Sequence, residues 1–230
     1  MNQTTTSTRL STITGAALLV VLAACAPAAT ATTPTTTAPA VSTTVATSVS
    51  LADPTAAVDL ATRFVAAYAA NDADTMALYL TAEALSEFGG SVEAMRLEFR
   101  FNEAQTFKHM FDSCEVQETS PSGTTVRCPY AYHGIRSDEM GLGPYTGSWY
   151  DLVILDGRIV SVEDHIVFLQ NGFDAQVWGP FADWVTETYP EDVAVMYTPG
   201  QTNVRITEES VALWEQRSRE FVAVVNSSAG

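Results

Sequence analysis

Hydrophobic residues recur every three or four positions from residue 53 onward, which is the spacing of one face of a helix. Asp53-Pro54 begins this pattern, because Asp is a common helix cap and Pro fits the first turn. Leu60, Phe64 and Tyr68 continue it. The same spacing predicts further helices at residues 72–80, 91–103, 174–188, 192–197 and 207–225.

Between these two groups of helices, β-branched and aromatic residues form short runs typical of strands. The predicted strands cover residues 106–117, 124–133 and 149–168, and the last of these folds back at Asp156-Gly157. Helices come first, strands second and helices last, without strand–helix alternation. This order predicts the α+β class, with an antiparallel sheet.

The N-terminus carries the pattern of an export signal. Arg9 is followed by an apolar run of about ten residues, half the roughly 20 that a membrane-spanning helix needs. The run ends in Leu22-Ala-Ala-Cys25, which resembles the bacterial lipobox. The resemblance implies that residues 1–24 are a signal peptide and that lipidated Cys25 holds the chain on the extracytoplasmic side of the cell membrane. An ordinary signal peptide, with Cys25 left as a free thiol, is the alternative.

Composition separates a tether from an acidic domain. Residues 25–50 consist almost wholly of Ala, Thr, Ser and Pro, which predicts a disordered tether. All 27 acidic residues follow from Asp53 onward, against ten Lys and Arg, which gives this part a net charge of −17. Such acidity disfavours nucleic acid as a partner, and solubility is its simplest interpretation.

Two cysteines remain for the folded part. Disulfides persist in exported proteins, so Cys114 and Cys128 predict a disulfide. The register that places these two cysteines opposite each other also places Val116 opposite Val126. Without a Cys-x-x-Cys motif or a histidine cluster, no metal site is predicted.

The Asp156-Gly157 turn fixes a second register. A two-residue hairpin loop sets Trp149 opposite Asp164 and Asp151 opposite Val162. Because side chains alternate between the faces of a strand, Trp149, Asp151 and Asp164 then share one face.

Two stretches resemble a known family. Residues 56–80 resemble the opening helix pair of the nuclear-transport-factor-2-like superfamily, in its SnoaL-like branch, and Leu155–Ile159 with the apolar strand after it resembles its closing hairpin. The resemblance covers residues 51–168 and implies a cone, in which a curved antiparallel sheet wraps around helices and leaves a pocket open at one end. Residues 169–230 are expected to form a helical extension packed on the same domain.

The two registers predict which polar residues line this pocket. They are Asp112, Asp151, Asp164, Trp149, Tyr130 and Tyr132. The resemblance implies that a buried carboxylate acts as a general base without a cofactor, with Asp164 preferred and Tyr130 or Tyr132 stabilising an oxyanion. His109, His133 and His165 are expected on the opposite face. Leu152 and Ile154 are also apolar on that face, so alternation alone leaves open which side is inward.

Three functions remain open. The preferred one is a non-catalytic module that binds a small apolar ligand or an envelope protein. The second is a cofactor-independent lyase or isomerase, and the third is an interaction domain whose pocket is filled by its own Trp and Phe side chains. The fold cannot choose among them. An exposed sheet face would also permit a homodimer.

Overall fold

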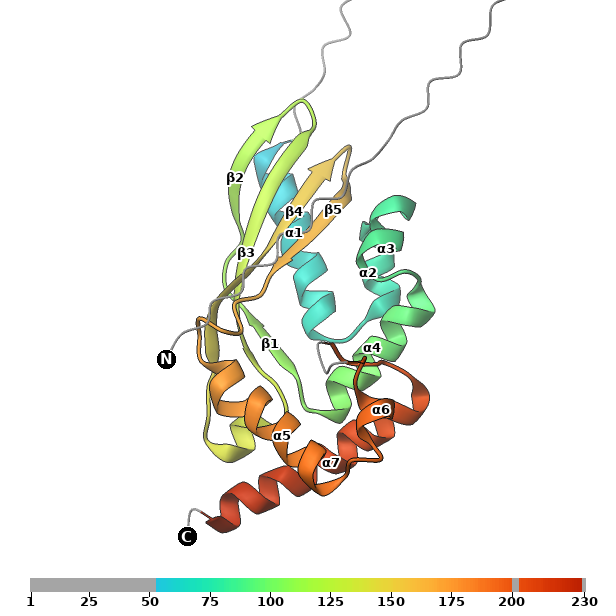
Figure 1. Cartoon of the computed structure of the whole chain (residues 1–230). Coiled ribbons are helices and arrows are strands. Elements are labelled where there is room, and N and C mark those ends of the chain that lie inside the picture. Colours follow the sequence, from blue (N-terminus) through green and yellow to red (C-terminus); the bar gives the residue numbers. More distant parts are fainter. Residues whose placement is uncertain (1–52, 200–202, 229–230) are drawn as a thin grey trace, which may run out of the picture. The chain divides into compact units, whose positions relative to one another are not determined.

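Helices come first in the computed structural model, which describes residues 53–199 and 203–228. The predicted signal peptide, Cys25 and the tether lie outside these residues. The first helices are α1 (Pro54–Ala69), α2 (Ala73–Tyr79), α3 (Ala82–Phe88) and α4 (Val92–Ala104) (Figure 1). Of these, α3 was not predicted.

Capping side chains explain where two of these helices begin. The carboxylate of Asp53 accepts a hydrogen bond from the Thr55 backbone N–H at 3.0 Å, and the hydroxyl of Ser91 accepts one from the Ala94 N–H at 3.1 Å. Each bond satisfies a backbone donor that has no partner inside the helix. The predicted start of the first helix at Asp53-Pro54 is therefore confirmed.

The sheet follows the helices, and its pairs are all antiparallel. Its strands are β1 (Lys108–Phe111), β2 (Glu115–Ser120), β3 (Gly123–His133), β4 (Tyr145–Leu155) and β5 (Arg158–His165). The order is β1-β3-β4-β5, and β2 pairs with the other end of β3. The α+β class and the antiparallel sheet are confirmed.

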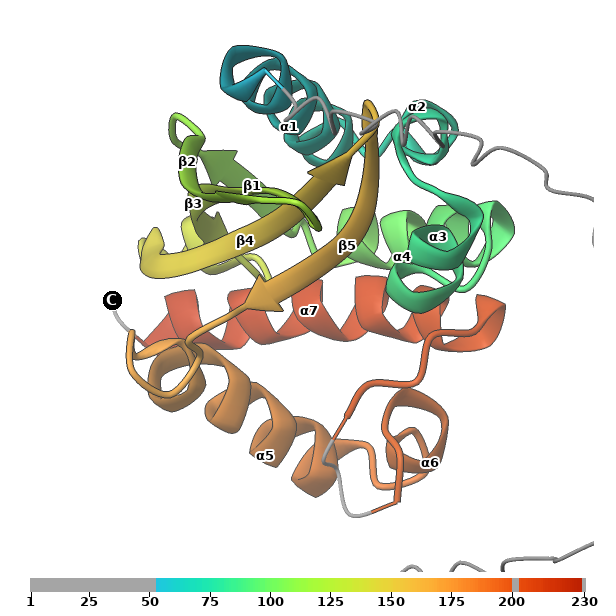
Figure 2. The ribbon, with the colours of Figure 1, turned by 90° about the horizontal axis from the view of Figure 1, so that it is seen from above.

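The remaining helical elements gather around α7, which itself packs on α4. They are η1 (Ser137–Met140), η2 (Asp174–Trp178), α5 (Gly179–Thr188), α6 (Val193–Met196) and α7 (Glu208–Ser228). Figure 2 shows α7 running alongside α4. Trp214 of α7 is fully buried, with its ring 5.2 Å from those of Phe101 and Phe181. No helix in the described residues has both the length and the apolar character required to cross a membrane.

The first predicted register holds in β2 and fails in β1. Cys114 and Cys128 form the predicted disulfide, and Val116 lies opposite Val126 as expected. The predicted strand at 106–117 is broken after Phe111, however, and the pairing on the β1 side of the break is shifted by one residue. Phe111, not Asp112, lies opposite Tyr130.

The second register also shifts by one residue. Leu155 lies opposite Arg158 and Ile154 opposite Ile159, as the Asp156-Gly157 turn predicts. A β-bulge then adds one residue to β5, so that Tyr150 lies opposite Asp164. Every β5 side chain beyond the bulge is displaced to the other face, because side chains alternate with a period of two.

The disulfide gives a prediction on stability. Replacing both Cys114 and Cys128 by Ala should lower the free energy of unfolding by about 3 kcal/mol, because the bond closes a short loop and restricts the unfolded chain. For a domain of this size, the melting temperature should fall by roughly 10 °C. Thermal unfolding of the two proteins at one pH measures the difference, and an unchanged melting temperature would refute a stabilising role.

Candidate functional site

Three predicted pocket residues lie on the outer face, because β4 turns Tyr150 and Leu152 inward and β1 ends before Asp112. Asp151 lies opposite Arg127, whose guanidinium donates two hydrogen bonds to its carboxylate at 2.9 and 2.7 Å, and these lower the pKa of Asp151. Trp149 donates to the same carboxylate at 3.1 Å and stacks on His165, at a ring distance of 4.7 Å. Asp112 is exposed beside them. The prediction that Asp112, Asp151 and Trp149 line the inner face is wrong.

Asp164 lies on the inner face, between two tyrosine hydroxyls. Tyr130 donates a hydrogen bond to one carboxylate oxygen at 2.7 Å, and Tyr150 donates to the other at 3.3 Å. Both tyrosines are only 2% exposed, whereas Asp164 keeps part of its surface in solvent. Desolvation raises the pKa of Asp164, and the two hydrogen bonds oppose this effect only in part.

Tyr132 also lies inside, but away from the carboxylate. Its hydroxyl accepts a hydrogen bond from the Asn171 side chain at 3.1 Å. Its ring stacks on Phe107 at 5.4 Å and meets Phe173 at 5.3 Å, and burial raises its pKa to about 12. Of the two predicted oxyanion donors, only Tyr130 contacts Asp164.

His109 was expected on the outer face, and the shift in β1 turns it inward. Its ring lies 4.7 Å from that of Tyr68 and 5.1 Å from that of Tyr130. Burial lowers the pKa of His109 to about 3, so the imidazole is neutral at physiological pH. Within the described residues it has no hydrogen-bond partner, which leaves both ring nitrogens available.

Glu98 is a second inward carboxylate, and the sequence analysis missed it. It lies on the buried side of α4, at helical spacing from Met95, Phe99 and Asn102. This spacing is the sequence signal that could have identified Glu98 as an inward residue. Desolvation raises the pKa of Glu98, and the nearby charge of Asp164 raises it further. Glu98 has no ion pair or hydrogen bond within the part of the chain that the structure describes.

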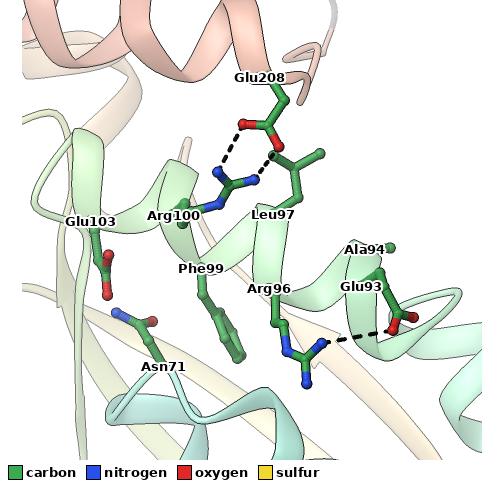
Figure 3. Close-up of a pocket in the computed structure, with 9 residues that line it drawn as sticks. All are labelled: Asn71, Glu93, Ala94, Arg96, Leu97, Phe99, Arg100, Glu103 and Glu208. Carbon is green, nitrogen blue, oxygen red and sulfur yellow. Dashed lines mark hydrogen bonds and ion pairs between the residues drawn. The ribbon is translucent and has the colours of Figure 1, made fainter.

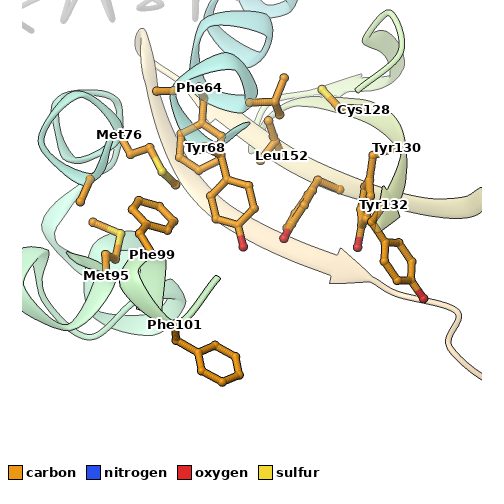
Figure 4. Packing of buried hydrophobic residues seen from close by; sticks show 14 of the residues in the cluster. Phe64, Tyr68, Met76, Met95, Phe99, Phe101, Cys128, Tyr130, Tyr132 and Leu152 are labelled. Atoms are coloured by element: carbon orange, nitrogen blue, oxygen red, sulfur yellow. The ribbon is translucent and has the colours of Figure 1, made fainter. Parts of the chain in front are cut away.

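These residues form one group, which we call the tyrosine–carboxylate cluster. Its members are Tyr68, Glu98, His109, Tyr130, Tyr150 and Asp164. Figure 4 shows the rings of Tyr68 and Tyr130, which project from α1 and β3 with their hydroxyl groups on the same side.

An apolar pocket of about 360 Å³ lies next to this cluster. Its main lining residues are Phe101, Phe107, Phe168, Leu169, Phe173 and Trp178. Phe107 joins the two regions, since its ring also lies 4.8 Å from that of His109. Asn102 supplies a polar group to the pocket wall; it is 8% exposed, and its side chain has no hydrogen-bond partner among the described residues.

A larger groove of about 730 Å³ follows α4 on the surface (Figure 3). Both arginines that line it are already paired. Arg100 makes a bidentate ion pair with Glu208. Arg96 pairs with Asp74 at 2.5 Å and with Glu93 at 3.7 Å. These pairs tie α4 to its neighbours, so the groove offers less for chemistry than the inner cluster. In residues 53–199 and 203–228, no three His, Cys, Asp or Glu side chains are grouped to hold a metal ion.

No protein-family model and no curated protein matches the sequence. Among solved structures, similarity is found to two proteins named "putative polyketide cyclase". The one from Xanthomonas campestris pv. campestris is 18% identical, with a TM-score of 0.40 over 54% of this chain and 98% of that one. The one from Silicibacter sp. TM1040 is 17% identical, with a TM-score of 0.35 over 52% and 93%. Likenesses at this level carry no information on activity.

His109 predicts how stability depends on pH. Its folded pKa of about 3 lies below the ordinary value of 6.5, so below pH 6.5 the unfolded chain takes up a proton that the folded chain does not. This group therefore stabilises the unfolded state as the pH falls toward 3. His109→Phe cannot take up this proton in the unfolded state. When the pH is lowered from 7 to 5, its free energy of unfolding should therefore rise by about 2 kcal/mol relative to that of the wild type. Urea denaturation at several pH values measures this, and parallel curves would contradict the neutral, buried imidazole.

Proposed function

We propose that this chain is an extracytoplasmic lipoprotein, anchored to the cell membrane through Cys25, whose folded domain binds a small apolar ligand or an envelope partner without catalysis. The observation that supports the binding role best is the apolar pocket of about 360 Å³ with five aromatic rings in its wall. Ligand pockets span roughly 300 to 1,000 Å³ and combine an apolar lining with a few polar groups.

The composition of the pocket wall supports an occupant that is mainly apolar. Leu169 is 73% exposed and Phe168 39% exposed, both at the pocket. Exposed hydrophobic residues at a cavity are a common mark of an interaction site. The unpaired amide of Asn102 gives the occupant one buried partner for a hydrogen bond, since an amide left unpaired after binding would cost free energy.

The pocket prediction is tested with N-phenyl-1-naphthylamine, a neutral probe that fluoresces in apolar surroundings. Leu169→Asp should weaken its binding about tenfold, because the substitution puts a charge at the apolar wall. Leu78→Asp is the matched control, since Leu78 is 68% exposed on α2 and does not line the pocket. Equal affinities of the two variants would refute binding in this pocket.

The anchor is tested by cell fractionation. Cys25→Ala removes the sulfur that would carry the lipid, so the chain should move from the membrane fraction to the soluble extracytoplasmic fraction. Ser42→Ala in the predicted tether serves as the control and should stay with the membrane. A Cys25→Ala chain retained in the membrane fraction would contradict the lipid anchor.

Asp164 supports a second candidate function, a cofactor-independent lyase or isomerase. A carboxylate with a raised pKa takes a proton more readily near neutrality, and Asp164 combines such a pKa with contact to solvent. In this scheme Asp164 removes a proton next to a carbonyl group. The Tyr130 hydroxyl, which donates to the carboxylate at 2.7 Å, then turns to the enolate oxygen.

The catalytic alternative is tested by proton exchange. Wild-type protein should accelerate the exchange of the α-protons of 1-indanone in D₂O, followed by NMR, and Asp164→Asn should remove at least 100-fold of this acceleration. Glu163→Gln is the control. Glu163 is the neighbour of Asp164 on β5, but it is exposed and lies opposite Asp151 in the β4–β5 register. Exchange at the uncatalysed rate in wild-type protein would count against general-base catalysis of this kind.

A further inference from the structure

We propose that the apolar pocket takes an uncharged amphiphile with a carbonyl head group, such as a primary amide, and that this head enters first, toward Asn102 and Gln105. The head group and the direction of the ligand rest on the binding role proposed above. They extend that role from an apolar occupant in general to one chemical class.

Two amide side chains line the pocket, and both are nearly excluded from solvent. Asn102 is 8% exposed and Gln105 is 5% exposed. They lie three positions apart at the C-terminal end of α4, which places them on one side of the helix. A buried amide group without a hydrogen-bond partner costs free energy, so these two side chains favour a ligand whose polar end reaches them.

The unpaired groups of these amides are mostly hydrogen-bond donors. The Ile135 backbone N–H donates to the side-chain oxygen of Gln105 at 3.3 Å, which leaves the Gln105 NH₂ group without a partner among the described residues. The Asn102 amide also lacks one in the part of the chain that the structure describes. A carbonyl oxygen can accept from two N–H donors, and the NH₂ group of a primary amide can donate to the Asn102 oxygen.

Charge at the pocket favours an uncharged head group over a carboxylate. Asp174 lines the pocket, is partly buried and makes no ion pair within the described residues. No Lys, Arg or His of residues 53–199 and 203–228 lines the same pocket. A carboxylate would therefore meet a like charge without a compensating cation. An ammonium group could pair with Asp174, but it would leave the Gln105 NH₂ group without an acceptor.

Exposure differs along the pocket wall, and this difference sets the direction of the ligand. Phe168 is 39% exposed and Leu169 is 73% exposed, so these side chains form the rim, whereas both amides belong to the buried wall. An apolar tail at the rim covers Phe168 and Leu169. The reverse direction would place the tail against two unpaired amides, which is unfavourable.

Octanamide and octanoate isolate the effect of the head group, because they share one chain and differ in charge at pH 7. Their binding to the unlipidated Cys25→Ala chain can be measured by ligand-observed NMR. Octanamide should bind about tenfold more tightly than octanoate, since only the carboxylate meets the charge of Asp174. Octylammonium is the cationic probe and should also bind more weakly than octanamide.

Substitutions at the buried wall test the contact with the head group. Gln105→Glu keeps an oxygen for the Ile135 N–H but replaces the NH₂ donor, so octanamide should bind about tenfold more weakly. Asn102→Leu should weaken octanamide similarly and leave the binding of N-phenyl-1-naphthylamine unchanged. Gln117→Glu is the matched control, because it adds the same charge at an exposed position on β2 that does not line the pocket.

Asp174→Asn tests the exclusion of carboxylates. It should raise the affinity for octanoate about fivefold and leave that for octanamide unchanged, because an uncharged head group does not sense the lost charge. The ratio of the two affinities is measured within one protein, so a partly unfolded sample does not alter it. For the direction, the terminal methyl group of bound octanamide should show nuclear Overhauser effects to the Phe168 ring and none to the Gln105 NH₂ group.

Equal affinities for octanamide and octanoate would overturn the inference, as would a failure of octanamide to bind or a loss in Gln117→Glu equal to that in Gln105→Glu. N-phenyl-1-naphthylamine has no carbonyl group and reports on the pocket by itself. If its binding depends on Leu169 while the octyl probes show no preference, the pocket stands and the head group is wrong. If Leu169→Asp leaves its binding unchanged, the binding role itself fails.

Discussion

The one-residue bulge between β4 and β5 determines which carboxylate the sheet turns inward. Without it, Asp151 and Asp164 would share a face; with it, they lie on opposite faces and have opposite chemistry. Asp151 is held outside by Arg127, and its pKa is lowered. Asp164 is held inside by two tyrosine hydroxyls, and its pKa is raised. The identity of the residue is the same in both cases, and the environment alone makes one a structural ion pair and the other a candidate for ligand binding or proton transfer.

The C-terminal helices form and support part of the wall of the apolar pocket. Helix α4 carries Glu98 toward the cluster and Phe101 toward the apolar pocket. Phe101 in turn packs against the fully buried Trp214 of α7, and Trp178 of η2 both stacks near Trp214 and lines the pocket. The segment after residue 168 therefore belongs to the candidate site, since it supplies one part of the pocket wall and supports another. Asp164 is in contact with solvent, while the Tyr130 and Tyr150 rings beside it are buried.

The sequence predicted well those features that depend on residues close together in the chain. The Asp53 cap, the Asp156-Gly157 turn and the Cys114–Cys128 pair each rest on local geometry, and each is present. The placement of the inner residues was predicted less well. Asp164 and Tyr130 were expected to share the inner face and do so. Asp112, Asp151 and Trp149 were expected there and lie outside, whereas His109 was expected outside and lies inside. Asp112 and His109 were misplaced because of the shift in β1, whereas Asp151 and Trp149 lie outside because Tyr150 and Leu152 are the inward residues of β4.

By itself, the sequence determined the order of helices and strands, the α+β class, the disulfide and the acidity of the folded part, because these follow from spacing, turn chemistry and composition. Only the tertiary structure decided which face of each strand is inward. The break after Phe111 and the bulge in β5 set the register of the residues beyond them, and no turn signal in the sequence predicted either one. Glu98 and Asp164 lie 66 positions apart in the chain, and only the fold brings their charges close enough for Asp164 to raise the pKa of Glu98.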